Sequence, residues 1–382
     1  MRILHICLAN FYVDGYNYQE NVLPRINKED GHEVRIIAST ATYTDNIHLG
    51  FMEPAEYLTE YGVPIKRLPY VKVGPDIITW RIRVYRNLYR EIAEFAPDVI
   101  FAHVLSFWSV LDVIRYKKDH PEVKFYADTH TAAYNSGRKW VTMHLLHRGL
   151  YRWLIQKAIP YLDKFFYIGT AERDFAKEHY SIPEEIMEFY PLGGDLLTEE
   201  EYATRRRVRR AELNLESDEL LLVHSGKLDA LKRTKELLEA FAAVPELKAK
   251  LAVIGTIPEE DRAELIRLME SDSRVMYLGW KKSSELLEYL CACDLYCQPG
   301  SVSATMQNAI CCGSPVMAYP HGAYTEKLDY GNILWVKTKK DMEGVFHDLE
   351  RKQINLETLR CGSEKCAREL LDYRVLAARL YR

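Results

Sequence analysis

The chain has 382 residues, of which 48% are hydrophobic and 28% charged, so it can bury substantial cores and is not disordered. This length predicts two domains of ordinary size rather than one. The formal net charge of −4 argues against a nucleic-acid-binding protein, because phosphate backbones call for a basic surface. No run of about 18 apolar residues is present, so no membrane-spanning helix is expected.

The chain opens on an apolar segment, residues 2–9, which stops at Asn10 and is followed by charged residues. This pattern is typical of a first buried strand rather than of a signal peptide. The eight cysteines form no CxxC pair, and no histidine stands at a usual ligand spacing from Cys291, Cys293 and Cys297. We therefore expect small buried side chains rather than a metal site, and a reducing, cytoplasmic location.

Twelve short segments rich in β-branched and aromatic residues alternate with helical patterns. They cover residues 2–9, 33–39, 97–104, 123–128, 164–170 and 186–192 in the first half, and 220–226, 250–256, 275–279, 295–300, 315–319 and 332–337 in the second. Their continuous apolarity indicates strands that are covered on both faces. Strands that alternate with helices imply parallel sheets. The sequence therefore predicts an α/β protein with two Rossmann-like domains, each on a six-stranded sheet.

Two glycines in "YPLGGD" follow the sixth strand and mark the predicted domain boundary. We expect a first domain over residues 1–191 and a second over 192–362. A C-terminal helix over 363–382 is expected to pack back on the first domain.

Two basic segments have more than one interpretation. "RRRVRR", within residues 199–210, follows three glutamates and is expected to form a solvated helix face. "RIRVYRNLYREIAEF", residues 81–95, predicts a basic amphipathic helix. Its apolar face either packs on the sheet or rests on anionic lipid, so a peripheral contact with the inner face of the membrane is left open.

Open parallel sheets bind ligands beyond the carboxyl ends of their strands, so the expected site is the cleft between the two domains. Gly226 and Lys227 follow the first strand of the second domain, and Lys232 precedes the next helix. Two cations around one loop suit a diphosphate whose charge must be neutralised. The alternative is that Lys227 and Lys232 are ordinary surface lysines.

The stretch "QPGSVSATMQNAICCGSPVMAYP", residues 298–320, predicts a strand end and then a short helix from about Ala304 to Cys312. Ser303 or Ser301 is expected to cap this helix.

The free amides near the start of that helix, from Ser303 to Thr305, form an expected anion site. Asn308 lies one turn deeper, on the face of Ala304 and Thr305. A capped helix with a purely structural role is the alternative.

These residues resemble family-4 glycosyltransferases, which are retaining enzymes of the two-domain GT-B type. The resemblance is carried by "HSGKLDALKRTKELLEAF", "RVMYLGW", "LCACDLYCQPGS" and "NAICCGSPVMAY" in the second half, and by "MRILHI", "GHEV" and "THTAAYNS" in the first. It covers nearly the whole chain. It implies an acceptor-side first domain, a donor-binding second domain, and transfer of a sugar to a glycan or lipid-linked acceptor in surface polysaccharide or glycoconjugate biosynthesis. The nucleotide-diphosphate sugar would be the co-substrate, with no metal and no other cofactor.

The resemblance assigns roles to particular residues of the second domain. Lys227 and Lys232 stand where the family grips the diphosphate, and counting back from Gly313 places the family's Glu-x7-Glu pair at Gly300 and Asn308. Asn308 can still accept a hydrogen bond from a ribose hydroxyl. Gly300 offers only backbone, so either the sugar contacts differ or the activity is altered.

Two further residues match family positions. His130 in "ADTHTAAYNSG" matches the family's His-Thr, which implies a contact with the transferred sugar that either orients a hydroxyl or helps to move a proton. By position alone, a packed histidine is an equal alternative. Glu326 in "GAYTEKL" matches a glutamate that is implied to touch the donor.

The loop after the first strand, "ANFYVDGYNYQENVLPR", carries aromatic and amide groups that suit sugar rings and hydroxyls. We assign to the acceptor side the following residues of this loop: Gly15, Tyr18, Gln19, Glu20 and Asn21. A plain connecting loop is the alternative. Arg138 and Lys139, after His130, suit an acceptor phosphate.

Several absent motifs narrow the choice. No Asp-x-Asp occurs, which disfavours metal-dependent single-domain glycosyltransferases, and neither GxGxxG nor a P-loop occurs, which disfavours dehydrogenases and kinases. Two alternatives to the transferase stay open: a non-catalytic nucleotide-sugar-binding partner and a nucleotide-sugar epimerase of the same fold.

Overall fold

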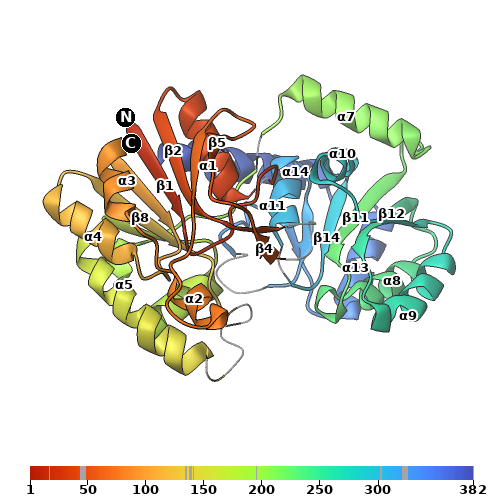
Figure 1. Ribbon diagram of the computed structural model, residues 1–382. Coiled ribbons are helices and arrows are strands. Elements are labelled where there is room, and N and C mark those ends of the chain that lie inside the picture. Colours follow the sequence, from red (N-terminus) through yellow and green to blue (C-terminus); the bar gives the residue numbers. More distant parts are fainter. Residues whose placement is uncertain are drawn as a thin grey trace. The chain divides into compact units, whose positions relative to one another are not determined.

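Two parallel sheets organise the chain, each at the centre of its own unit (Figure 1). The computed structural model describes residues 1–16, 18–43, 49–133, 136, 140, 142–194, 196–301, 303–320 and 326–381. The first unit comprises Met1–Pro191 with Leu376–Arg382, and the second comprises Leu192–Val375.

The sheet of the first unit has the strand order β10-β9-β8-β7-β1-β2-β6-β5. Its strands are β1 (Arg2–Cys7), β2 (Glu33–Ser39), β5 (Glu56–Leu58), β6 (Pro64–Leu68), β7 (Val99–His103), β8 (Lys124–Thr129), β9 (Lys164–Tyr167) and β10 (Met187–Phe189). Neighbours pair in parallel except β5, which runs antiparallel to β6. A separate antiparallel pair consists of β3 (Ala41–Tyr43) and β4 (Leu49–Phe51).

Helices connect these strands. They are α1 (Gln19–Glu29), α2 (Asp76–Ile82), α3 (Leu88–Phe95), α4 (Val110–Asp119), α5 (Arg152–Ala158) and α6 (Thr170–Phe175), with shorter or π-type turns η1 (Thr142–Tyr151), η2 (Ile159–Tyr161), η3 (Ala176–Tyr180) and η4 (Glu184–Ile186). The last helix of the chain is α15 (Tyr373–Ala378). Near its end, the carbonyl of Leu376 accepts a hydrogen bond from the Tyr190 hydroxyl at 2.7 Å, which ties the chain end to the first unit.

The sheet of the second unit has six parallel strands in the order β13-β12-β11-β14-β15-β16. Its strands are β11 (Leu220–Lys227), β12 (Ala249–Thr256), β13 (Val275–Gly279), β14 (Leu295–Gln298), β15 (Val316–Ala318) and β16 (Ile333–Trp335). Its helices are α7 (Glu199–Glu212), η5 (Ala230–Lys232), α8 (Thr234–Ala242), α9 (Glu259–Glu270), α10 (Ser283–Ala292), α11 (Ala304–Cys311), α13 (Lys339–Glu350), α14 (Leu356–Cys366) and η6 (Ala367–Leu371). The strand order reverses between β11 and β14, and such a switch point is where open sheets bind ligands.

Helices cover both faces of each sheet, which explains why the strands are continuously apolar. On β1, Leu4 and Ile6 pack with α3, α4 and α5, whereas Cys7 packs in a second cluster with β2 and β6. On β11, Val223 packs with α10 and α11, whereas Leu222 packs with α8 and α13. The predicted α/β class with two Rossmann-like sheets is confirmed.

The prediction of six strands is wrong for the first unit. All twelve predicted strands are present, but β5 and β6 extend this sheet to eight. Strand β6 was missed because its sequence, "PIKRL", lacks the apolar run of a buried strand. Arg67 of β6 is nevertheless buried, because its guanidinium donates to the carbonyl oxygens of Tyr12 and Ser39 and pairs with Asp14 at 2.7 Å.

The single helix predicted over residues 81–95 is also wrong. Between α2 and α3, Arg83 and Asn87 adopt left-handed backbone with φ of 58° and 62°. Tyr85 between them is buried, and its hydroxyl donates to the carbonyl of Leu8 at 2.8 Å. Burial of this ring takes the chain out of a continuous helix.

The apolar face of α3 packs in the core of the first unit through Leu88, Ile92 and Phe95. Of the two alternatives for this apolar face, packing is therefore the one observed, and core residues occupy the face that would have met lipid. Among the helices of the described ranges, none is both long enough and apolar enough to cross a bilayer.

The arginines of α7 form more ion pairs than a solvated helix face would. Arg206 and Arg210 pair with Asp294 at 2.5 and 2.8 Å, and Arg209 pairs with Glu288 of α10. Asp294 also accepts the backbone N–H of Leu221 at 2.8 Å. The carboxylate therefore fixes α7 to the starts of β11 and β14.

The cysteines are free and mostly buried, as expected for small apolar side chains. Two depart from that expectation, since Cys311 is half-buried and Cys361 is exposed.

Replacing Asp294 by Asn is expected to destabilise the second unit. The substitution puts an amide NH2 against two guanidinium groups and leaves their charges uncompensated in a mostly buried setting. A loss of roughly 3 kcal/mol is expected for a broken buried pair, which lowers the melting temperature by about 5–10 °C in a unit of this size. Differential scanning calorimetry measures the shift. The matched control is Asp218→Asn, which alters an exposed pair with Lys248 and is expected to leave the melting temperature unchanged; equal shifts in both variants would contradict this assignment.

Candidate functional site

The carboxyl end of β11 leads into a tight turn that buries Lys232. The side chain is only 6% exposed, and its ammonium donates to the carbonyl oxygen of Ser301 at 2.8 Å. Burial lowers the pKa of Lys232 to about 8, and the Asp229 carboxylate offsets only part of this effect. A buried ammonium bonded to a carbonyl keeps its net charge, so it can still neutralise an anion that comes into contact with it.

The two predicted lysines differ in environment. Gly226 has a φ of 134°, and a Cβ there would lie 3.0 Å from Cε of Lys232, so the lysine stem packs against this glycine. Lys227, in contrast, is exposed. One cation is therefore fixed in place and the other is free to move at the surface.

A buried histidine fixes the elements around Lys232. The Nδ1 atom of His224 lies 2.8 Å from the carbonyl oxygen of Cys297, and Nε2 lies 2.9 Å from the hydroxyl of Thr234. Burial lowers the pKa of His224 to about 4, so the ring is neutral at pH 7. The ring thereby joins β11 to β14 and to the start of α8, at both ends of the Lys232 turn.

Gly300 lies where two turns of the backbone meet. A Cβ at this position would lie 2.1 Å from the carbonyl oxygen of Leu231 and 2.7 Å from the carbonyl carbon of Lys232. The N–H of Ser301 donates to the same Leu231 oxygen at 2.8 Å. Because the obstructing atoms are backbone, no side chain fits here without moving a turn. Glycine at this position has a packing cause.

Helix α11 begins directly after this turn, and the predicted serine cap is wrong. Ser303 occupies the cap position, but no side chain caps the helix. Its hydroxyl instead donates to Oε1 of Gln298 at 3.1 Å. Ala304 is exposed and Thr305 is half-buried at the start of the helix, so this end is open to a ligand.

Asn308 and Glu326 complete the predicted donor residues. Asn308 is half-buried on α11, and a Cβ on Gly194 would lie 3.2 Å from its Oδ1 atom, so the linker segment packs closely on this side chain. Glu326 is exposed.

In the first unit, His130 follows β8 and faces a buried carboxylate. Nε2 of His130 lies 3.5 Å from Oδ2 of Asp128, and the histidine side chain is 30% exposed. The same oxygen lies 2.9 Å from Nδ1 of His103 on β7. Burial opposes ionisation of Asp128, but the two histidines hold the pKa of its carboxyl well below its usual range.

The charge of His130 follows from this arrangement. Burial works against the imidazolium, but the Asp128 carboxylate, with Glu20 and Glu172 also contributing, raises the pKa of His130 to about 9. His130 is therefore charged at neutral pH, unlike an ordinary surface histidine.

The predicted acceptor loop is only partly exposed. Gly15 has a φ of 75°, and Tyr18 is 46% exposed at the start of α1. Gln19 is buried and donates to the carbonyl of Pro191 at 3.4 Å, while Glu20 is buried and accepts from Asn10 at 2.9 Å. These two side chains are therefore engaged in packing.

Asn21 is likewise buried, and its amide donates to the carbonyl of Val13 at 2.9 Å. Within this loop, Tyr18 is thus the predicted side chain that stays accessible. Arg138 and Lys139 lie outside the described residues.

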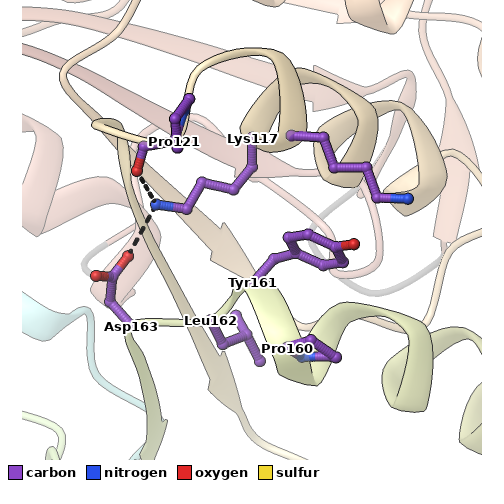
Figure 2. A pocket seen from close by; sticks show the side chains of 7 residues that line it. Lys117, Pro121, Pro160, Tyr161, Leu162 and Asp163 are labelled. Carbon is purple, nitrogen blue, oxygen red and sulfur yellow. Dashed lines mark hydrogen bonds and ion pairs between the residues drawn. The ribbon is translucent and has the colours of Figure 1, made fainter.

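A hollow of about 380 Å³ lies at the opposite edge of the sheet of the first unit (Figure 2). Its lining residues precede β8 and β9, so they meet at the amino ends of these strands. The ammonium of Lys117 already donates to the carbonyl of Pro121 at 2.8 Å and lies 3.5 Å from the carboxylate of Asp163. Since His130 follows the carboxyl end of β8, this hollow is separate from the candidate site. Across the described ranges, no group of three or more His, Cys, Asp or Glu side chains is placed to hold a metal ion.

Two family models match the sequence. The one described as "Glycosyltransferase Family 4" matches residues 27–196, and the one described as "Glycosyl transferases group 1" matches residues 205–355. Together they span most of the chain. The chain belongs to the family-4 glycosyltransferases of the GT-B type.

Known proteins similar to this glycosyltransferase agree in fold. The HepE protein of Anabaena, solved in complex with UDP, superimposes with a TM-score of 0.69 at 14% identity, covering 99% of this chain and 98% of that one. Sucrose-phosphate synthase of Thermosynechococcus elongatus gives a TM-score of 0.65 at 14% identity, covering 99% and 97%. N-acetyl-alpha-D-glucosaminyl L-malate synthase of Bacillus anthracis is 27% identical over 141 residues, which span 36% of this chain and 36% of that protein.

Sequence reasoning about this glycosyltransferase missed three buried polar side chains, His103, Asp128 and His224. Asp128 ends a predicted strand and His103 is the last residue but one of another, so their position at the carboxyl edge was a usable signal. His224 lies inside a strand and gave none, because its partners come from β14 and α8.

Replacing Gly300 by Ala is expected to damage the donor half of the glycosyltransferase. The new methyl group would meet backbone, so the variant must open the contact between the Leu231 turn and Ser301, at about 1–3 kcal/mol. Thermal unfolding and UDP affinity measure the two effects. The control is Gly344→Ala on α13, where a Cβ meets nothing within 4 Å and is expected to stabilise by about 0.5–1 kcal/mol. A neutral Gly300→Ala variant would show that the turns are not in contact.

Replacing Asp128 by Asn is expected to lower the pKa of His130 from about 9 to below 6.5. The substitution removes the carboxylate that favours the imidazolium, while burial, which favours the neutral ring, remains. NMR titration of the His130 ring protons measures the pKa. A value that stays near 9 would mean that another group charges this histidine.

Proposed function

We propose that this protein is a retaining glycosyltransferase that moves a sugar from a nucleotide-diphosphate donor to a glycan or lipid-linked acceptor. The observation that carries the proposal is the buried ammonium of Lys232 at the switch point of the second sheet, beside the uncapped start of α11. The transfer breaks the bond between the anomeric carbon and a diphosphate oxygen and forms a bond from that carbon to an acceptor oxygen. Negative charge develops on the leaving diphosphate, and the acceptor hydroxyl gives up its proton to an oxygen of that diphosphate.

Stabilising the leaving diphosphate is the main task of such a site, because developing charge is what fixed donors lower in energy. Lys232 offers a charged donor that is already desolvated and oriented. The first amides of α11 add the partial positive charge of a helix start. In this proposal Lys227 reaches the diphosphate from the surface, and no metal ion is needed.

The remaining predicted residues receive roles within the same proposal. Asn308 accepts a hydrogen bond from a ribose hydroxyl through its amide oxygen. His130 contacts the transferred sugar, Glu326 touches the donor, and Tyr18 belongs to the acceptor side. A nucleotide-sugar donor is supported by the UDP in the Anabaena protein. A place in surface polysaccharide or glycoconjugate assembly remains a prediction, as does the cytoplasmic location. The apolar face on which a peripheral membrane contact was expected packs in the core instead.

The two alternatives have less support. A non-catalytic binding partner was suggested by Gly300, but the glycine has a packing cause and the lysine that meets the leaving charge is retained. UDP binding without hydrolysis or transfer across a broad acceptor panel would favour it. A nucleotide-sugar epimerase would give a new sugar nucleotide without any acceptor, which product analysis detects.

Replacing Lys232 by Ala is expected to weaken UDP binding by about 10- to 100-fold, because a charge-assisted hydrogen bond is lost, and to abolish transfer. Calorimetry with UDP and a transfer assay over nucleotide sugars measure the two effects. The control is Lys235→Ala on α8. The ammonium of Lys235 is exposed and pairs with Glu264 at 2.6 Å, so this substitution is expected to leave UDP binding and transfer unchanged. Undiminished transfer by Lys232→Ala would refute the proposal.

The same lysine predicts how binding depends on pH. A free-state pKa of about 8 means that Lys232 loses its charge above pH 8, so UDP affinity is expected to fall between pH 7 and 10. The phosphates of UDP keep their charge over this interval, because they lose their last proton at about pH 6. In Lys232→Arg the decline is expected to be absent, because arginine stays charged.

A further inference from the structure

A continuous line of buried polar side chains runs across three neighbouring strands of the first unit and ends beneath His130. His5 on β1, His103 on β7 and Asp128 on β8 are almost completely buried. Nδ1 of His5 lies 3.2 Å from Nε2 of His103, and Nδ1 of His103 lies 2.9 Å from Oδ2 of Asp128. At the far end, Nε2 of His5 lies 2.9 Å from the side-chain amide of Asn27 on α1. The function proposed above uses only the last member, His130.

The carboxylate at the end of this line is held from two sides. Oδ1 of Asp128 accepts the backbone N–H of Val104 at 3.0 Å, and Oδ2 faces both His103 at 2.9 Å and His130 at 3.5 Å. A carboxylate that accepts hydrogen bonds on both oxygens is favoured over the neutral acid, even when buried.

The direction of the hydrogen bond next to this carboxylate follows from it. Asp128 accepts, so His103 carries a proton on Nδ1. Burial, with His103 as the next cause, lowers the pKa of His5 to about 3, so His5 is neutral and carries a single ring proton.

The amide of Asn27 holds the far end of the line. Its Oδ1 atom lies 2.9 Å from Nε2 of His5, and both side chains are buried, so the amide fixes the orientation of the His5 ring.

We propose that Asn27, His5 and His103 form a hydrogen-bonded line that holds Asp128 as a carboxylate beneath His130, and so keeps His130 in its charged, hydrogen-bond-donating form. His5 and His103 are then positioning residues: they act on the substrate only through Asp128 and His130. The acidic groups that act on His130 come from three elements, Asp128 on β8, Glu20 on α1 and Glu172 on α6, and all three favour the imidazolium.

The inference decides between the two roles left open for His130. An imidazolium donates a hydrogen bond and offers no lone pair, so it cannot take a proton from the acceptor hydroxyl. It can donate to a sugar hydroxyl or to a developing negative charge. This catalytic consequence rests on the proposed glycosyltransferase function, whereas the charge state of His130 does not.

The charge state of His130 is tested on the unmodified protein. The ¹⁵N chemical shifts of the two nitrogens of a histidine ring distinguish a protonated from an unprotonated atom. Near pH 7, His103 is expected to carry a proton on Nδ1, and His130 is expected to carry protons on both nitrogens. An unprotonated Nδ1 of His103 or a neutral His130 would overturn the proposal whatever the protein's activity.

Two variants of His103 test the positioning role. His103→Asn keeps a donor where Nδ1 was, whereas His103→Leu removes it. In the Leu variant the buried Asp128 loses one of its donors and tends toward the neutral acid, so the pKa of His130 is expected to fall by at least about one unit. The Asn variant is expected to keep the pKa near the wild-type value, although both variants lose the contact to His5.

Activity provides the second readout for these variants. His103→Leu is expected to lower kcat by about 10- to 100-fold, with its alkaline decline moved to lower pH and KM for the donor unchanged. His103→Asn is expected to restore most of kcat. Equal pKa values of His130 in folded Leu and Asn variants would refute the positioning role. If the variants show the expected pKa shifts of His130 but the wild-type protein transfers no sugar, the proposed glycosyltransferase function is refuted and the positioning role of His103 stands.

Discussion

The hydrogen bond from the buried ammonium of Lys232 to the carbonyl of Ser301 is the contact on which the donor half depends. It joins the turn after β11 to the turn after β14, and the Ser301 N–H returns a second bond to the carbonyl of Leu231. With the two backbones in contact, a glycine is required at position 300. No side chain therefore fits at position 300 while these turns are in contact, and the cation that the proposed function assigns to a diphosphate is part of the same contact.

In each unit, a charged group that matters for the candidate site is kept out of water at the carboxyl edge of the sheet. In the second unit the group is the ammonium of Lys232, and in the first it is the carboxylate of Asp128, which is bonded on both oxygens. Burying a charge is costly unless hydrogen bonds compensate for it, so both arrangements restrict where the neighbouring backbone can lie. The two buried groups differ in sign. In the proposed function both nevertheless present positive charge to a ligand, Lys232 directly and Asp128 through His130.

The apolar strands were predictable because both faces of each sheet are covered, and all twelve expected strands are present. Strand β6 was not predictable, because it is held by a buried arginine whose partners are carbonyls distant in the sequence. The helix expected over residues 81–95 was broken by burial of Tyr85, which local periodicity does not reveal. Lys232 and His130 were named from motif positions, but their charge states depend on Ser301 and Asp128, whose distances only the fold supplies.

The most direct measurement is a crystal structure of this protein with UDP bound. The account predicts diphosphate oxygens within about 3 Å of Nζ of Lys232 and of the first backbone amides of α11. It also predicts that the contact between Ser301 and Leu231 is unchanged by the ligand. UDP bound at another edge of the second unit, with Lys232 still bonded to the Ser301 carbonyl alone, would contradict it.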